Sequence, residues 1–166
     1  MTNYRFSEGA AIVFGGSGGL GTGIVDLLSK SGTDVAFTYF KNKEAAEINL
    51  KTIEENGKNG YFESVDLLNV STVESFSNSA KEKFGRIHSV ISATGPLIHL
   101  APILNSKPED FYNTLDTDIK GFYHVLRSVV PILRDGGGGS ITALTTAAVH
   151  KYINTAGLSS IPKTVI

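Results

Sequence analysis

Residues 10–21 read AAIVFGGSGGLG, and this stretch decides the fold class. Its first part, Ala10–Phe14, is a short apolar run of the kind that forms a buried strand. Glycines follow at positions 15, 19 and 21, where the strand would give way to a helix. A glycine turn between a first strand and a helix is typical of dinucleotide-binding sheets, because the turn is tight and the backbone must approach a pyrophosphate closely. The helix N-terminus would then offer free N–H groups and a positive dipole end to the phosphates.

The composition fits one globular domain of 166 residues, with 41% apolar and 19% charged residues. A formal net charge of −1 gives no sign of nucleic acid or membrane as a partner. The absence of cysteine excludes disulfides, thiolate metal ligands and cysteine nucleophiles, and the four histidines lack metal-ligand spacing, so no metal is expected. Met1–Gly9 is polar and lacks an apolar signal region, and no apolar run approaches the roughly 20 residues of a membrane span. We therefore expect a cytoplasmic protein.

The rest of the chain alternates short apolar strands with amphipathic helices. Strands are predicted at Ala10–Phe14, Asp34–Phe40, Tyr61–Val65, Ile87–Ala93 and Ser140–Thr145. The helices between them are predicted at Leu20–Ser29, from Asn42 as cap to Asn56, from a capping box of Ser71 and Glu74, and from a second capping box of Ser106 and Glu109 to about Leu133.

This alternation implies parallel strands joined by right-handed crossovers. We predict an α/β, doubly wound parallel sheet, a three-layer αβα Rossmann fold with strand order 3-2-1-4-5. Residues 1–166 would form one dinucleotide-binding domain. Because the pattern stops at Ile166 inside the next expected helix, we expect its C-terminal part to be lacking.

The glycine-rich turn supplies the first candidate cofactor residues, which are Gly15, Ser17, Gly18, Gly19, Leu20 and Gly21. No G-x-x-x-x-G-K-[ST] is present, which argues against a P-loop. Many glycine turns bind nothing, but a place after the first of five alternating strands favours nucleotide binding.

The end of the second predicted strand bears on the choice of dinucleotide. A site for NAD has an acidic residue there. From Thr38 onward, this chain has no acidic residue before Glu44. Lys41 and Lys43, beside Tyr39, could instead face a 2′-phosphate, which favours NADP(H) over NAD(H). The alternative is that both lysines are solvated loop charges.

The spacing Gly15-x-x-x-Gly19-x-Gly21 resembles the cofactor signature of the short-chain dehydrogenases/reductases, and the resemblance covers essentially the whole chain. The family usually has Thr before the first glycine, where this chain has Phe14. Asp66 and Leu67 resemble the family's adenine-contacting segment. Gly95 matches the last residue of a family turn that is often Asn-Asn-Ala-Gly, and the turn here consists of Ser92, Ala93, Thr94 and Gly95.

An aspartate interrupts the apolar stripe of the long predicted helix. The stripe consists of Phe111, Leu115, Phe122, Val125 and Val129, with Asp118 among them. A carboxylate on a core face is costly unless it has partners. In the family the matching position commonly holds an Asn that binds water in a proton relay, a role that Asp118 could take. Alternatively, Asp118 lies at the edge of the stripe and reaches solvent, or it bonds local backbone.

The same resemblance places the catalytic candidates. Thr146 falls on the family's catalytic Ser, and Lys163 falls on its Lys, which lowers the pKa of the family's Tyr and holds the nicotinamide ribose. Ser159 occupies the position of that Tyr, the family's proton donor, and a serine hydroxyl is a far poorer acid than a phenol. Tyr152 is the nearest tyrosine. Lys163 could also be a plain surface lysine.

The resemblance implies an NADP(H)-dependent oxidoreductase that transfers a hydride between the nicotinamide and a small carbonyl or secondary alcohol substrate. Within the family the chain is most similar to the 3-oxoacyl-[acyl-carrier-protein] reductases. It also implies a homo-oligomer, a dimer or tetramer, with the long helix at a subunit interface. Two alternatives stay open, namely a catalytically impaired NADP(H)-binding protein with a binding or regulatory role and a regulatory α/β domain that binds no nucleotide.

Overall fold

Five parallel strands form one sheet in the order β3-β2-β1-β4-β5, as predicted. The computed structural model describes residues 6–166, so the first five residues of the polar N-terminal stretch lie outside the described residues. The strands are β1 (Ala10–Phe14), β2 (Asp34–Tyr39), β3 (Gly60–Ser64), β4 (Ile87–Ser92) and β5 (Ser140–Ala143). The α-helices are α1 (Gly19–Lys30), α2 (Lys43–Glu55), α3 (Val70–Phe84), α4 (Pro108–Leu115), α5 (Gly121–Asp135) and α6 (Gly157–Lys163).

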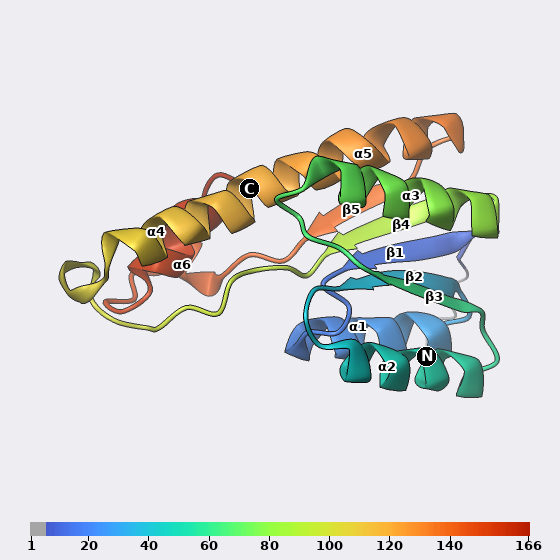
Figure 1. Cartoon of the computed structure of the whole chain (residues 1–166), viewed down its shortest axis with the longest axis horizontal. Coiled ribbons are helices and arrows are strands. Elements are labelled where there is room, and N and C mark those ends of the chain that lie inside the picture. The colour runs from blue at the N-terminus through green and yellow to red at the C-terminus, as the bar shows by residue number, and fades with distance from the viewer. Residues whose placement is uncertain (1–5) are drawn as a thin grey trace.

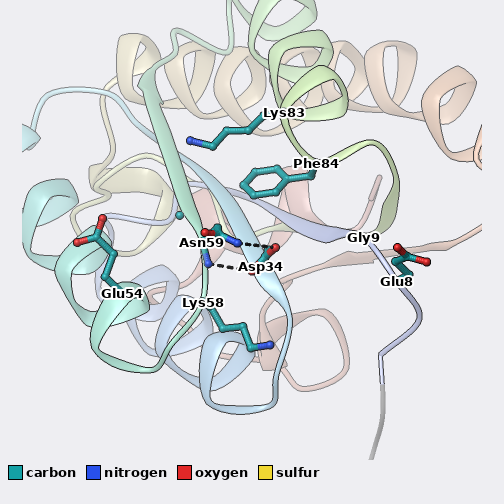
Figure 2. A pocket seen from close by; sticks show the side chains of 9 residues that line it. Glu8, Gly9, Asp34, Glu54, Lys58, Asn59, Lys83 and Phe84 are labelled. Atoms are coloured by element: carbon teal, nitrogen blue, oxygen red, sulfur yellow. Dashed lines mark hydrogen bonds between the residues drawn. The ribbon is translucent and has the colours of Figure 1, made fainter.

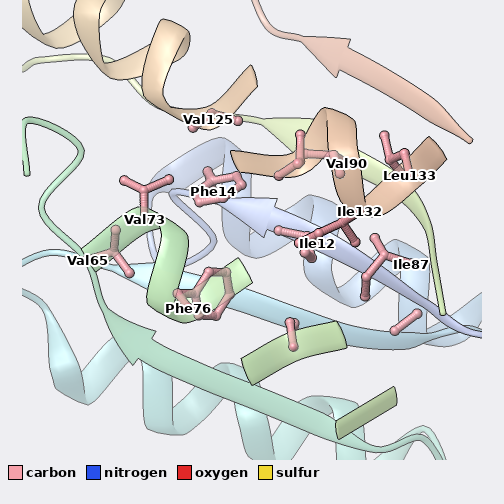
Figure 3. Close-up of a cluster of buried hydrophobic side chains, with 14 residues drawn as sticks. Ile12, Phe14, Val65, Val73, Phe76, Ile87, Val90, Val125, Ile132 and Leu133 are labelled. Atoms are coloured by element: carbon pink, nitrogen blue, oxygen red, sulfur yellow. The ribbon is translucent and has the colours of Figure 1, made fainter. Parts of the chain in front are cut away.

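Helices cover both faces of the sheet, with α1 and α2 on one side and α3 and α5 on the other (Figure 1). The central strand β1 is fully buried along its whole length, as a strand covered on both faces must be. Ile12 and Phe14 point into the cluster under α3 and α5 (Figure 3), whereas Val13 points into the cluster under α1 and α2. Among residues 6–166, no helix is both long and apolar enough to cross a membrane.

The predicted caps meet different outcomes. Asn42 caps α2 as predicted, because its side chain accepts a hydrogen bond from the Ala45 N–H at 3.1 Å. The capping box at Ser71 is wrong, because Asn69, which is an equally good capping residue placed earlier, accepts from the Ser71 N–H and starts α3 at Val70. The box at Ser106 is also wrong. Its hydroxyl donates back to the Ile103 carbonyl at 2.7 Å, and α4 starts without a side-chain cap.

The long helix predicted up to Leu133 exists, but a π-helical turn at Asp116–Lys120 divides it into α4 and α5. This turn places Asp118 in the interior, where it is only 3% exposed. A predicted stripe at steps of three and four presupposes an α-helix throughout, so it could not show this turn. Strand β5 ends at Ala143, two residues earlier than predicted.

Candidate functional site

The glycine turn lies at the carboxyl end of the central strand, and its three motif glycines answer different demands. Gly15 has a φ of +80°, in the left-handed region that favours glycine. A Cβ on Gly21 would lie 2.0 Å from the Gly15 carbonyl oxygen, so glycine is required for α1 to pack against the turn. A Cβ on Gly19 would meet no atom within 4 Å, so the fold itself does not need glycine there. These are the tight turn, the close packing and the open approach that a pyrophosphate site needs.

The N-terminus of α1 beside this turn is suited to an anion. Its capping residue is Gly18, which has no side chain to bond the N–H groups of the first turn. Ser17 is half-buried and Leu20 is exposed. The first N–H groups of a helix lack intrahelical partners, so this end presents donors and a positive dipole end.

The two lysines considered for a 2′-phosphate follow β2, with Lys41 in the loop and Lys43 as the first residue of α2. The Lys41 ammonium lies 5.3 Å from the centroid of the Phe40 ring, and the Lys43 ammonium lies 3.3 Å from the Glu47 carboxylate. Both lysines are exposed. Tyr39 instead packs its ring edge-on against Phe62. Because parallel strands end at one edge of a sheet, this loop and the glycine turn share that edge.

The segment after β3 is shaped by its own hydrogen bonds. The Asp66 carboxylate accepts from the Leu68 N–H at 2.9 Å. The Leu67 carbonyl accepts from the Nδ1–H of His124, a residue of α5, at 2.6 Å. His124, for which the sequence indicates no role, thus fixes the predicted adenine segment. No spacing signal in the sequence pairs these two residues.

The turn after β4 crosses the point where the strand order reverses. The Ala93 N–H donates to the Phe14 carbonyl at 3.0 Å, which joins this turn to the end of β1. The Ser92 and Thr94 hydroxyls lie 3.3 Å apart. The Lys163 ammonium donates to the Thr94 carbonyl at 3.0 Å, across 69 residues of sequence.

Asp118 and Lys163 form a buried ion pair beside this turn. The Lys163 Nζ lies 3.0 Å from the Asp118 Oδ1, and the two side chains are 11% and 2% exposed, respectively. The two atoms are close enough for an ion pair, but their geometry does not make a hydrogen bond to Oδ1. Burial raises the pKa of the Asp118 carboxyl, and the Lys163 ammonium opposes part of that rise. The structure therefore contradicts both the solvent-edge interpretation of Asp118 and the surface interpretation of Lys163.

Gly95 lies against this pair. A Cβ at Gly95 would lie 3.6 Å from the Asp118 Oδ1 and 3.8 Å from the Lys163 Nζ. The lack of a side chain there leaves the approach to the pair open from the β4 turn. The structure thus brings Thr94, Gly95, Asp118 and Lys163 together at the carboxyl edge of the sheet.

The remaining catalytic candidates have different surroundings. Thr146 accepts a hydrogen bond from the Ala148 N–H at 3.3 Å and caps the 3-10 turn at Ala147–Val149, which packs against α6. Ser159 is half-buried and lies one helical turn before Lys163 on α6, so both side chains share a face. Tyr152 is 87% exposed and its hydroxyl donates to Asn154, so the structure does not bring it to the cluster.

An open hollow of about 540 Å³ lies elsewhere, at the amino ends of β1, β2 and β3 (Figure 2). The Asn59 N–H donates to the Asp34 carboxylate within it at 2.8 Å. None of the predicted cofactor residues lines this hollow, and it lies at the sheet edge opposite the glycine turn. In the described part of the chain, no three His, Asp or Glu side chains are grouped as metal ligands.

The profile of the short chain dehydrogenase family matches residues 9–158, from the start of β1 to within α6. The chain belongs to the short-chain dehydrogenase family. The predicted family and fold are therefore confirmed. The family consists of oxidoreductases that use a nicotinamide dinucleotide and act on carbonyl or alcohol groups.

Several individual short-chain dehydrogenases resemble the chain. It is 27% identical over 147 residues to versicolorin reductase stcU of Emericella nidulans, covering 89% of this chain and 55% of that protein. It is 23% identical over 137 residues to a 3-oxoacyl-[acyl-carrier-protein] reductase of Staphylococcus aureus, covering 82% and 55%. The structure of NAD+-bound xylitol dehydrogenase superposes with a TM-score of 0.90 at 23% identity, covering 97% and 62%. The chain thus spans little more than half the length of these relatives.

Proposed function

We propose that this chain forms the dinucleotide-binding part of an NADP(H)-dependent oxidoreductase that acts on a carbonyl or secondary alcohol. The observation that carries the proposal is the contrast between Gly21 and Gly19. Packing of α1 requires the first glycine, whereas the second faces open space at a helix N-terminus without a side-chain cap. At a helix N-terminus after the first strand, a glycine that the fold does not need is explained by a ligand that must come close.

The residues present fit the dinucleotide along the carboxyl edge of the sheet. The turn around Gly19 would hold the pyrophosphate, and Asp66 with Leu67 would face the adenine. The β4 turn, Thr94 and Gly95, would lie beside the nicotinamide ribose together with Lys163. When bound, the dinucleotide would supply or accept the hydride.

Lys41 and Lys43 support the choice of NADP(H). Both ammonium groups are exposed at the end of β2, where no acidic residue occurs before Glu44. Exposed ion pairs are worth about 0–1 kcal/mol, so Lys43 would give up Glu47 for a 2′-phosphate at little cost.

Lys163 would donate hydrogen bonds to the reacting groups and assist the proton transfer. An ammonium has three donors, and its hydrogen bond to the Thr94 carbonyl uses one of them. Its other donors would serve the ribose, or the carbonyl oxygen that takes up a proton when the hydride reaches the carbon. The buried Asp118 side chain holds Lys163 at this place, with 3.0 Å between Oδ1 and Nζ. The Ser159 and Thr146 hydroxyls would hydrogen-bond the substrate oxygen.

A dinucleotide-binding protein with impaired catalysis is the second candidate. The observation that favours it is the pair of departures at the proton donor, because Ser159 stands in the Tyr position and Tyr152 is exposed. Turnover across a panel of ketones distinguishes the two. An enzyme reduces at least one of them with NADPH and loses that rate in Lys163→Ala, whereas the second candidate binds NADPH and reduces none.

Titration with NADPH and NADH, followed by nicotinamide fluorescence, tests the cofactor. NADPH should bind about tenfold tighter or more, and the Lys41→Ala/Lys43→Ala variant should lose the preference and leave NADH binding unchanged. Tighter binding of NADH would overturn the NADP(H) assignment, and failure to bind either dinucleotide would overturn the proposed function.

We further propose a homo-oligomer through the long helix. Tyr123 and Val130 on α5 are 59% and 39% exposed, which supports an apolar contact on that helix. Size-exclusion chromatography with light scattering should give the mass of a dimer or tetramer. A monomer mass at all concentrations would contradict the proposed oligomer.

A further inference from the structure

Two buried polar side chains hold the glycine turn from outside the motif. The Gly15 N–H donates to the Thr38 hydroxyl of β2 at 2.9 Å. The Asn49 side-chain amide of α2 donates to the Gly16 carbonyl at 2.9 Å and to the Thr22 hydroxyl at 3.1 Å. Thr38 and Asn49 are each 3% exposed. Thr38 belongs to β2, the strand that pairs with β1, and Asn49 belongs to the helix that follows β2.

These bonds set the direction of whole peptide groups. In a planar trans peptide, the C=O and the following N–H point in opposite directions. Holding the Gly15 N–H at Thr38 therefore directs the Phe14 carbonyl the other way, and that carbonyl indeed meets the Ala93 N–H at 3.0 Å. By the same rule, holding the Gly16 carbonyl at Asn49 directs the Ser17 N–H away from α2.

Packing alone does not explain Asn49. It shares the buried face of α2 with Ala46 and Ile53, where an apolar residue would cost nothing to bury. An amide is costly to bury unless it is hydrogen-bonded. Its amide nitrogen donates one hydrogen bond to the glycine turn and one to Thr22 at the start of α1. We therefore attribute its polar side chain to holding the glycine turn.

We propose that Thr38 and Asn49 are positioning residues that fix the glycine turn in the conformation in which the Ser17 N–H faces the pyrophosphate of the dinucleotide. This inference rests on the proposed function. It implies that the β2–α2 unit, which includes Lys41 and Lys43, also sets the phosphate-binding geometry. Because the pyrophosphate is common to both dinucleotides, loss of either side chain should weaken NADPH and NADH by the same factor.

Asn56 provides a matched control for Asn49. Asn56 follows the last residue of α2, and its amide likewise makes two side-chain bonds to α1, to Ser29 at 2.8 Å and to Asp26 at 3.3 Å, but at the end remote from the turn. Dissociation constants of NADPH and NADH are measured by nicotinamide fluorescence well below each variant's melting temperature. Asn49→Ala should weaken both about tenfold with their ratio unchanged, and Asn56→Ala should leave both at the wild-type value while lowering the melting temperature.

A second pair of variants keeps the test independent of any folding defect in Asn49→Ala. Thr38→Val preserves the shape of the strand residue and removes the hydroxyl, whereas Thr38→Ser keeps the hydroxyl. Thr38→Val should weaken both dinucleotides several-fold and Thr38→Ser should restore most of the affinity. Wild-type affinity in folded Asn49→Ala and Thr38→Val, or an equal loss in Asn56→Ala, would overturn the positioning role. A wild-type chain that binds neither dinucleotide would overturn the proposed function as well.

Discussion

At the scale of single residues, the buried contact between Asp118 and Lys163 joins the π turn of the long helix to α6. The apolar stripe identified the carboxylate as out of place, and the family resemblance matched Lys163 to the catalytic lysine. Neither observation placed the two side chains together, because a π turn sets the position of Asp118 and α6 sets that of Lys163. The resulting contact is a tertiary property of two segments 45 residues apart.

A double-mutant cycle tests the energy of that contact. Lys163→Met leaves the Asp118 carboxylate buried without its cation and should lower the free energy of unfolding by about 3 kcal/mol. Asp118→Asn in the same chain removes the uncompensated charge and should recover most of the loss. Urea denaturation of the four proteins measures it, and additive effects of the two substitutions would show that the side chains are not coupled.

At the scale of elements, the strands could be read from short apolar runs because a sheet covered on both faces needs them. Helix starts were harder, because Ser71 and Ser106 look like caps in the sequence. In the structure Asn69 caps α3 instead, and the Ser106 hydroxyl donates to the Ile103 carbonyl. The hydrogen bonds of Asn49 to the Gly16 carbonyl and of His124 to the Leu67 carbonyl also escaped prediction, because each joins segments that are distant in the sequence. A polar residue on a buried helix face was the available signal for Asn49.

His88, near the amino end of β4, makes the stability of the sheet dependent on pH. Its Nε2 and Nδ1 lie 2.9 Å from the Thr33 and Ser89 hydroxyls, and its ring stacks on Phe6 with centroids 5.2 Å apart. Burial, with the Arg86 charge as a smaller cause, lowers the pKa of His88 below its ordinary value of 6.5. Below pH 6.5 the unfolded chain therefore binds a proton that the folded chain does not, so stability falls as the pH falls.

The expected slope between pH 6.5 and the lowered pKa is at most about 1.4 kcal/mol per pH unit from this residue. Chemical denaturation at pH 7, 6 and 5 should show a flatter decline for His88→Gln than for the wild type. His99 is exposed, so His99→Gln is the control and should keep the wild-type decline. Parallel curves for the wild type and His88→Gln would exclude His88 as the source.

At the scale of the whole molecule, the candidate site is assembled from the carboxyl ends of β1 to β4 and from α6. Alternation of strands and helices predicts the shared edge, since parallel strands end on one side. Motif matching predicted the glycine turn and the family. It could not show that Gly19 and Gly21 have different roles, because the residues are identical in type and differ only in their three-dimensional surroundings.

We expect residues 1–166 to unfold as one cooperative domain that NADPH stabilises. Scanning calorimetry should give a single transition. NADPH at 100 times its dissociation constant should add about 2.7 kcal/mol of stability, which raises the melting temperature by about 5–10 °C for a chain of this length. Two resolved transitions would contradict the single domain, and an unchanged melting temperature would contradict preferential binding to the folded chain.

The most direct test of the account is the NADPH affinity of Gly19→Ala set beside that of Gly23→Ala. Both glycines lie in α1, and a Cβ at either would meet no atom of the protein within 4 Å, so both variants should fold with at least wild-type stability. If Gly19 is kept free for the pyrophosphate, Gly19→Ala should bind NADPH at least about tenfold more weakly while Gly23→Ala binds as the wild type does. Equal, undiminished affinity in both variants would contradict a dinucleotide site at this turn.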